Sequence, residues 1–239
     1  MGHKKKRPAA KLCVYCRQRP GSTADHVPPQ NLYPAPLPQN LVTVPCCGPC
    51  NQAKRMDDDY LREYLVIEAA GQGHPIAEAI FQGPLLRASV DPYYKRTPLL
   101  HVARWSGLLA PRYAADGQYL GDFVRIPLQA ARIQRIFVRL THALYYAARH
   151  DYLPAEYGVG VRYVPPTEAL AQVEQLRHIG MQSLYFAGAG EVFGCLYGFG
   201  AGADHQAKSI WLLEFYQSVH YVTFTAPLAA FPEHPPGAE

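Results

Sequence analysis

Side chains able to catalyse hydrolysis gather in one short stretch of this 239-residue chain, between positions 25 and 54. Hydrolysis of a phosphodiester needs a nucleophilic water, neutralisation of charge at phosphorus and help for the departing oxygen. An unperturbed imidazole can accept a proton near neutral pH, so His26 is our candidate for the general base. The oxygens of Asp25 and Asn51 suit a hard cation such as Mg²⁺ or Mn²⁺. Lys54 follows Asn51 by one helical turn and either holds a phosphate or is an ordinary solvated lysine.

Two pairs of cysteines flank these residues. Cys13 and Cys16 form the first pair, and Cys47 and Cys50 repeat its spacing. Thiolates at this spacing can face one tetrahedral ion, and two such pairs complete a four-sulfur zinc site that supports the folding of a small unit. Cys46 is an alternative third ligand, but we prefer Cys47 for its spacing and expect Cys46 to be a packed free thiol. Taken alone, the cysteines favour a structural zinc ribbon without chemistry.

The order of these residues resembles the HNH endonucleases, the zinc-knuckle branch of the ββα-metal nucleases. The resemblance covers residues 12–60, about a quarter of the chain. The matching segments are Cys13-Val-Tyr-Cys16, Asp25-His26-Val-Pro, Asn40-Leu-Val-Thr-Val and Cys47-Gly-Pro-Cys50-Asn51-Gln-Ala-Lys54. The last signature residue is asparagine rather than histidine, an H-N-N version of the motif, so the resemblance does not specify which metal is preferred.

The resemblance implies a role for each matching residue. Asp25 and Asn51 would hold one divalent cation between a strand and a helix, and Asn40 would hydrogen-bond across the loop and orient the base. Lys54 and the adjacent Arg55 are expected to contact the nucleic acid. The expected reaction is in-line attack by water on one phosphodiester, which leaves a 5′ phosphate and a 3′ hydroxyl.

The elements that must position these residues are short and local. Residues 12–66 predict a cysteine knuckle, a short strand, a loop, a second strand at 41–44 and a long helix from 47 onward. Five prolines between positions 28 and 38 exclude regular structure from the loop. Pro45 should end the second strand, and Gly71 and Gly73 should end the helix. The predicted unit is therefore a ββα-metal module around a four-cysteine zinc site.

The remaining residues, 67–239, predict a larger α+β domain whose role the sequence does not specify: DNA positioning, dimerisation or regulation. A short helix at 75–90 precedes a stretch of loops and short strands at 91–127. The strongest signals that follow are a long amphipathic helix at 128–150, a helix from an N-cap at Thr167 to Gly180, and strands at 192–199, 209–216 and 219–225. Two residues separate the last two strands, which predicts an antiparallel hairpin.

Composition bounds the class of protein. Residues 1–65 hold ten Lys/Arg against five Asp/Glu, so the positive charge lies with the motif segment, where a polyanion would bind. Residues 1–11 predict a disordered basic tail rather than a secretory signal. No apolar run approaches the ~20 residues of a membrane span, and clustered cysteines are typical of a reducing compartment. We therefore expect a soluble cytoplasmic protein that does not contact membranes.

Two further charged groups carry weaker predictions. Asp57, Asp58 and Asp59 could bind a second metal, but three acidic residues within a helix more often form its solvated face, which we favour. Arg132, Arg135 and Arg139 recur along one side of the long helix. They either follow a nucleic-acid backbone or form a solvent face, and the sequence does not decide between the two.

These observations together predict a metal-dependent HNH endonuclease acting on DNA, with RNA as an alternative substrate, in phage defence or DNA mobility. The expected cofactors are a structural Zn²⁺ and a catalytic Mg²⁺ or Mn²⁺; a homodimer or an activating partner protein is left open. Two other classes remain: a zinc-dependent DNA-binding module that does not cleave, and a zinc-stabilised interaction protein. Neither class requires Asp25, His26, Asn40 and Asn51 together.

Overall fold

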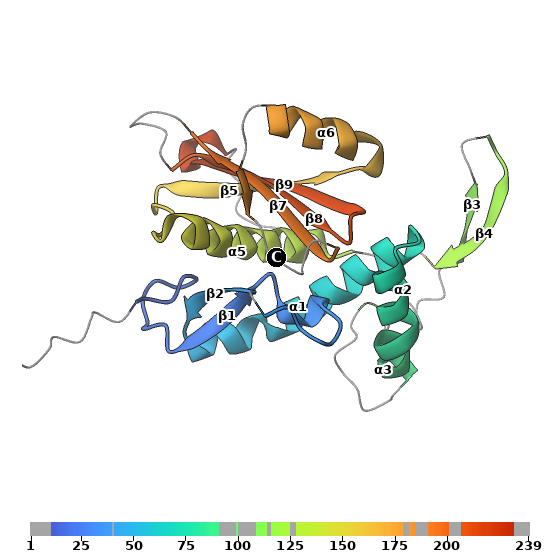
Figure 1. Cartoon of the computed structure of the whole chain (residues 1–239), viewed down its shortest axis with the longest axis horizontal. Coiled ribbons are helices and arrows are strands. Elements are labelled where there is room, and N and C mark those ends of the chain that lie inside the picture. The colour runs from blue at the N-terminus through green and yellow to red at the C-terminus, as the bar shows by residue number, and fades with distance from the viewer. Residues whose placement is uncertain are drawn as a thin grey trace, which may run out of the picture.

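The computed structural model describes residues 11–39, 41–90, 99, 109–113, 116–124, 128–178, 182–184, 191–200 and 207–231. These residues form a mixed α+β structure with antiparallel sheets (Figure 1). The helices are α1 (Gly48–Gly71), α2 (Pro75–Ile80), α3 (Leu86–Val90), α5 (Ala130–Arg149) and α6 (Pro166–His178), with a π-helical segment at Phe81–Leu85 and 3-10 turns at Gln30–Leu32 and Leu228–Ala230. The strands are β1 (Thr23–Val27), β2 (Val42–Cys46), β3 (Leu109–Tyr113), β4 (Tyr119–Val124), β5 (Tyr157–Val164), β6 (Gln182–Leu184), β7 (Phe193–Phe199), β8 (Ser209–Phe215) and β9 (Val219–Pro227).

The N-terminal elements confirm the predicted order of knuckle, strand, loop, strand and long helix. β1 and β2 pair antiparallel, with His26 opposite Thr43. α1 begins directly after β2 with proline in its first turn, where the missing N–H has no intrahelical partner to lose. Gly73, at φ +80°, follows the end of the helix in the left-handed conformation that glycine adopts readily. The expectation that Pro45 ends the second strand is wrong: it lies inside β2, which pairs with β1 in a two-stranded sheet of the described residues and tolerates the missing donor.

The C-terminal elements form one five-stranded antiparallel sheet in the order β5-β9-β8-β7-β6. Figure 1 shows α5 along one face of this sheet and α6 along the other. The alternation of β8 explains both contacts, because Trp211 and Leu213 belong to the main core with α5, whereas Leu212 packs with residues of β5 and α6 in a smaller cluster. The predicted hairpin is confirmed as β8–β9, with Phe215 opposite Val219. The predicted N-cap at Thr167 is wrong, since α6 already begins at Pro166.

The main hydrophobic core is continuous between the N-terminal elements and the C-terminal sheet. It extends from Val14 and Val44 to Phe137 on α5 and Tyr221 on β9. α1 and α5 contact each other, both contact β1, and α1 also contacts β9. The Tyr64 and Tyr221 hydroxyls are 2.8 Å apart, which links α1 directly to the sheet. The N-terminal site is therefore supported from behind by residues that come much later in the chain.

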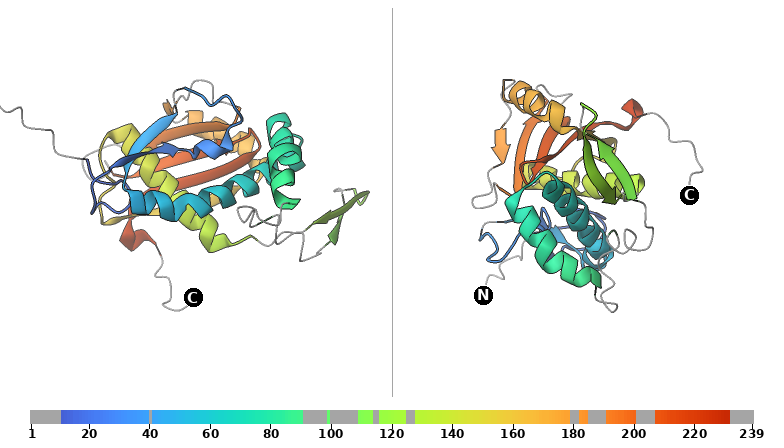
Figure 2. Two further views of the ribbon diagram at one scale, coloured as in Figure 1. Left: turned by 90° about the horizontal axis from the view of Figure 1, so that it is seen from below. Right: turned by 90° about the vertical axis from the view of Figure 1, so that its right-hand side faces the viewer.

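The β3–β4 hairpin projects from this body, as the left view of Figure 2 shows. Its strands pair antiparallel with a register shift beside Tyr113. Tyr113 and Tyr119 form an edge-to-face pair on the hairpin, and both side chains are exposed. In the part of the chain that the structure describes, no helix combines the length and the apolar character required to cross a membrane.

Candidate functional site

The four predicted zinc ligands meet in one cluster. Cys13 and Cys16 precede β1, and Cys47 and Cys50 stand at the start of α1. Their sulfurs all lie within 4.8 Å of one another, and the Cys16 and Cys47 sulfurs are 3.8 Å apart. Sulfurs placed tetrahedrally at about 2.3 Å from a zinc ion are about 3.8 Å apart. The donor set and its spacing therefore fit a structural metal such as zinc.

The backbone prepares the first pair of thiols for a metal. N–H groups of Gln18 and Arg19 point at Cys16 and lower the pKa of its thiol to about 6. Burial works to raise the pKa of Cys13, but backbone N–H groups outweigh burial and lower that pKa. A metal binds the thiolate form, so these contacts favour the bound state.

Cys46 packs against this cluster but is not one of the four cysteines whose sulfurs lie within 4.8 Å of one another. Its thiol donates to the carbonyl of Cys47 at 3.4 Å, and burial raises its pKa to about 12. The side chain is fully buried. Cys46 is thus a packed thiol, and the structure places Cys47 rather than Cys46 with the other three cysteines.

Beside the cysteine cluster is an open cleft of about 730 Å³ between β1, the loop that follows it and the first turns of α1. The cleft brings together Asp25, His26, Asn51, Lys54 and Arg55, five of the six residues that the sequence predicts for the hydrolytic site. Its other lining residues are Ala24, Pro29, Gln30, Asn31, Gly48, Gln52, Asp58 and Asp59. The sixth predicted residue, Asn40, lies outside the described residues.

Asp25 is the centre of a buried network inside the cleft. The Tyr15 hydroxyl donates to Oδ2 of Asp25, and the Lys54 ammonium lies 2.9 Å from Oδ1. Lys54 also contacts Oδ2 of Asp58 at 2.5 Å. The Lys54 side chain is 8% exposed, so the alternative of an ordinary solvated lysine is wrong.

Burial and neighbouring charges shift the pKa values of the ionisable side chains in this network. Burial alone would lower the pKa of Lys54, but the carboxylates of Asp58 and Asp25 outweigh it and raise that pKa, so the ammonium stays charged. Burial raises the pKa of Asp58 to about 6, although Lys54 opposes the shift. One ammonium therefore serves two carboxylates, and the network carries an excess of negative charge.

The oxygen donors in the cleft fit a hard divalent cation in chemical type, because Asp25 supplies a carboxylate and Asn51 an amide oxygen. Both oxygens of Asp25 already have partners, however, in Tyr15 and Lys54. A cation that bound Oδ1 of Asp25 would compete with the Lys54 ammonium. Asp58 gives Lys54 a second carboxylate partner.

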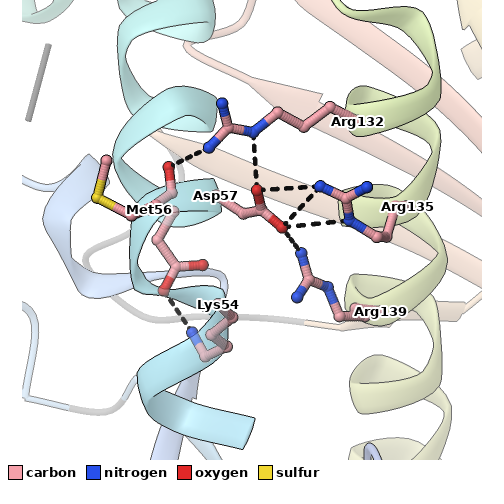
Figure 3. A network of polar contacts seen from close by, with 7 residues as sticks. Lys54, Met56, Asp57, Arg132, Arg135 and Arg139 are labelled. Carbon is pink, nitrogen blue, oxygen red and sulfur yellow. Dashed lines mark hydrogen bonds and ion pairs between the residues drawn. The ribbon is translucent and has the colours of Figure 1, made fainter. Parts of the chain in front are cut away.

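On the next turn of α1, Asp57 faces α5 and meets the three arginines of that helix (Figure 3). Nε of Arg132 donates to Oδ1 of Asp57 at 2.7 Å, Arg135 contacts both oxygens at 3.4–3.5 Å, and Arg139 donates to Oδ2. Burial works to raise the pKa of Asp57, but the three guanidinium donors outweigh it and lower that pKa.

The favoured prediction of a solvated acidic face at positions 57–59 is wrong. The Asp57 and Asp59 side chains are buried, and Asp59 accepts a hydrogen bond from Asn31 at 3.2 Å. Two sequence patterns could have signalled the pairing of Asp57 with the arginines: the acidic run at positions 57–59 and the arginine repeat at positions 132, 135 and 139. Neither pattern identifies the other as its partner, because 75 or more residues separate them.

The geometry thus combines a zinc-type cysteine cluster, a polar cleft containing a histidine and a carboxylate, and a salt-bridged helix behind the cleft. Comparison of the chain with protein families, with curated proteins and with solved structures found no match.

Proposed function

We propose that this protein is a metal-dependent endonuclease of the HNH type that hydrolyses phosphodiester bonds of DNA. One observation carries the proposal: Asp25, His26 and Asn51 line a single cleft between β1, the loop that follows it and the start of α1, beside four clustered cysteines. A zinc ribbon needs only the cysteines. A cleft containing a base, oxygen ligands and buried cationic charge is what phosphodiester hydrolysis requires.

In the proposed mechanism, the imidazole of His26 accepts a proton from a water as the water oxygen attacks phosphorus. The bond from phosphorus to the 3′ oxygen breaks, and the leaving oxygen takes up a proton. A cation held by Asp25 and Asn51 would neutralise charge on the phosphate and assist the leaving group. Tyr15 holds Oδ2 of Asp25 and so fixes the orientation of its carboxylate.

Lys54 and Arg55 would bind the phosphates on either side of the scissile bond. Arg55 is exposed at the cleft, whereas Lys54 is buried against Asp25 and Asp58. The Lys54 ammonium has three N–H donors, and Asp25 and Asp58 are two partners for them, so one donor would be available to a phosphate in the cleft.

The test is cleavage of a supercoiled plasmid by the full chain in Mg²⁺, Mn²⁺ or EDTA, with His26→Ala beside the wild type. Loss of a general base reduces such a rate about 10²- to 10⁴-fold. His178→Ala, at the end of α6 on the far face of the sheet, is the matched control and should cleave normally. Equal cleavage by His26→Ala and wild type would refute the role of His26. DNA binding without cleavage in any metal would instead favour a non-cleaving DNA-binding module.

A further inference from the structure

We propose that Arg135 and Arg139 form a second phosphate-binding site on α5, which holds a duplex DNA strand where it leaves the cleft. This inference rests on the proposed function, because it names an additional contact for the same substrate. Neither arginine lies in the segment that resembles a nuclease. The site belongs to the larger C-terminal part of the chain and gives that part a role in positioning DNA.

The first argument is the balance of charge. One carboxylate, Asp57, faces three guanidiniums, so this group has two positive charges in excess. The neighbouring network of Asp25, Lys54 and Asp58 has one excess negative charge. A site with surplus guanidinium charge is completed by an anion, and phosphate matches the fork of N–H donors on arginine.

The second argument is the difference in exposure among the three arginines. The Arg132 side chain is 16% exposed; it donates to Asp57 and to the carbonyl of Met56 and lies over the Tyr60 ring at 4.3 Å. The Arg135 side chain is 57% exposed, and its contacts to Asp57 are long, at 3.4–3.5 Å. A guanidinium has five N–H donors, so Arg135 keeps donors for a ligand while Asp57 holds it in place. Arg132 is structural, and Arg135 is available.

The third argument is position. Arg139 lines a small pocket together with His26, Asp25, Lys54 and Asp58. Arg139 therefore contacts Asp57 and also lies beside the proposed catalytic residues. Figure 3 shows Arg135 and Arg139 on α5 pointing at Asp57 of α1, with Lys54 on the neighbouring turn of α1. Arg135 lies one turn before Arg139 on the same helix.

The test measures duplex DNA affinity in EDTA, where cleavage does not interfere, at several salt concentrations. Each phosphate contact adds about 0.9 to the slope of log affinity against log salt. Arg135→Gln should reduce the slope by about 0.9 and weaken binding several-fold at low salt. The control is Arg162→Gln on β5, whose side chain is 51% exposed and which carries the same change of charge. The control should leave the slope unchanged.

Three outcomes are informative. A lower slope for Arg135→Gln alone supports the site. An unchanged slope for Arg135→Gln, in a protein that binds and cleaves DNA, overturns the site and leaves the proposed function intact. If the wild type binds no DNA even at low salt, this site and the proposed function both fail. Thermal melting of each variant shows whether a change in binding arises from a change in folding.

Discussion

Two buried charge clusters lie on adjacent turns of α1 and have opposite compositions. Around Lys54, one ammonium is shared by the carboxylates of Asp25 and Asp58. Around Asp57, one carboxylate is shared by three guanidiniums. The Lys54 and Asp57 side chains at their centres are buried, so water screens the charges of these two groups less than on an open surface.

The two clusters accommodate their excess charge in different ways. In the first, the pKa of Asp58 is raised to about 6, so the surplus carboxylate takes up a proton easily. In the second, Arg135 extends into water. The first cluster is thus suited to an added cation and the second to an added anion. A divalent ion and a phosphate chain are the two ligands that the proposed reaction would bring together.

The largest expected effect comes from neutralising the carboxylate of the second cluster. Asp57→Asn should destabilise the fold by about 3 kcal/mol, because it leaves guanidiniums partly buried without their counter-charge. Urea unfolding at pH 7 measures the change. Glu174→Gln, on the exposed side of α6, is the control and should shift stability by less than about 0.5 kcal/mol. A small effect at Asp57 would mean that the arginines do not depend on it.

The pH dependence of the stability difference between wild type and Asp57→Asn provides a further test. The pKa of Asp57 is lower in the folded state, so the stability that it contributes is present above the unfolded pKa of about 3.9 and is lost as pH falls through the folded value. The stability difference between wild type and Asp57→Asn should therefore be constant above about pH 5 and shrink below about pH 4. Urea midpoints from pH 3 to 7 measure it. A gap that widens in acid would contradict the assignment.

For the first cluster, Lys54→Met should tighten Mn²⁺ binding about tenfold, equivalent to about 1.4 kcal/mol, because the competing ammonium is gone. Titration of Mn²⁺ without DNA, followed by electron paramagnetic resonance, measures the affinity. Lys208→Met removes the same charge beside β8 and serves as the control. Equal affinity in wild type and Lys54→Met would show that the lysine and the cation do not share Asp25.

The smallest expected change in stability is that of Arg135→Gln, and it distinguishes Arg135 from Arg132. Arg135→Gln should change stability by less than about 0.5 kcal/mol, since an exposed ion pair contributes little. Arg132→Gln should cost about 2 kcal/mol, because it loses a buried ion pair and its position over Tyr60. Thermal melting compares the two. Equal losses would mean that Arg135 is structural, contrary to its availability for phosphate.

The N-terminal unit was predictable because its determinants are local. Ligand spacing, the proline-rich loop and the glycines after α1 all act within a few residues of the structure they specify. β5 was not predicted, since Gly158 and Gly160 interrupt its pattern of apolar residues. The structure explains them: a Cβ on Gly160 would lie 2.2 Å from the ring of Phe224, and one on Gly158 would lie 2.8 Å from that of Phe231. The aromatic residues that require these glycines lie on or just beyond a strand more than 60 residues downstream.

In the candidate site, too, some residues were predictable from the sequence and others were not. The cysteines, Asp25, His26 and Asn51 were found from the sequence because the chemistry requires their types at short spacings. The partners of Lys54 and Asp57 were not found, since an ion pair leaves no periodic trace in a sequence. Burial converts these side chains from surface charges into members of the site, and burial here depends on α5.

The tyrosines that join the two ends of the chain bear on its biosynthesis. Tyr216 donates to the carbonyl of Leu32 at 2.6 Å, and Tyr64 meets Tyr221, across separations of 184 and 157 residues. At about 5–20 residues per second, a ribosome needs on the order of ten seconds to travel from α1 to β9. During that time the nascent chain carries every cleft residue without the strands that cover the back of α1. We therefore expect proteases to recognise a truncated or stalled product, which would lack the support that the proposed nuclease site requires.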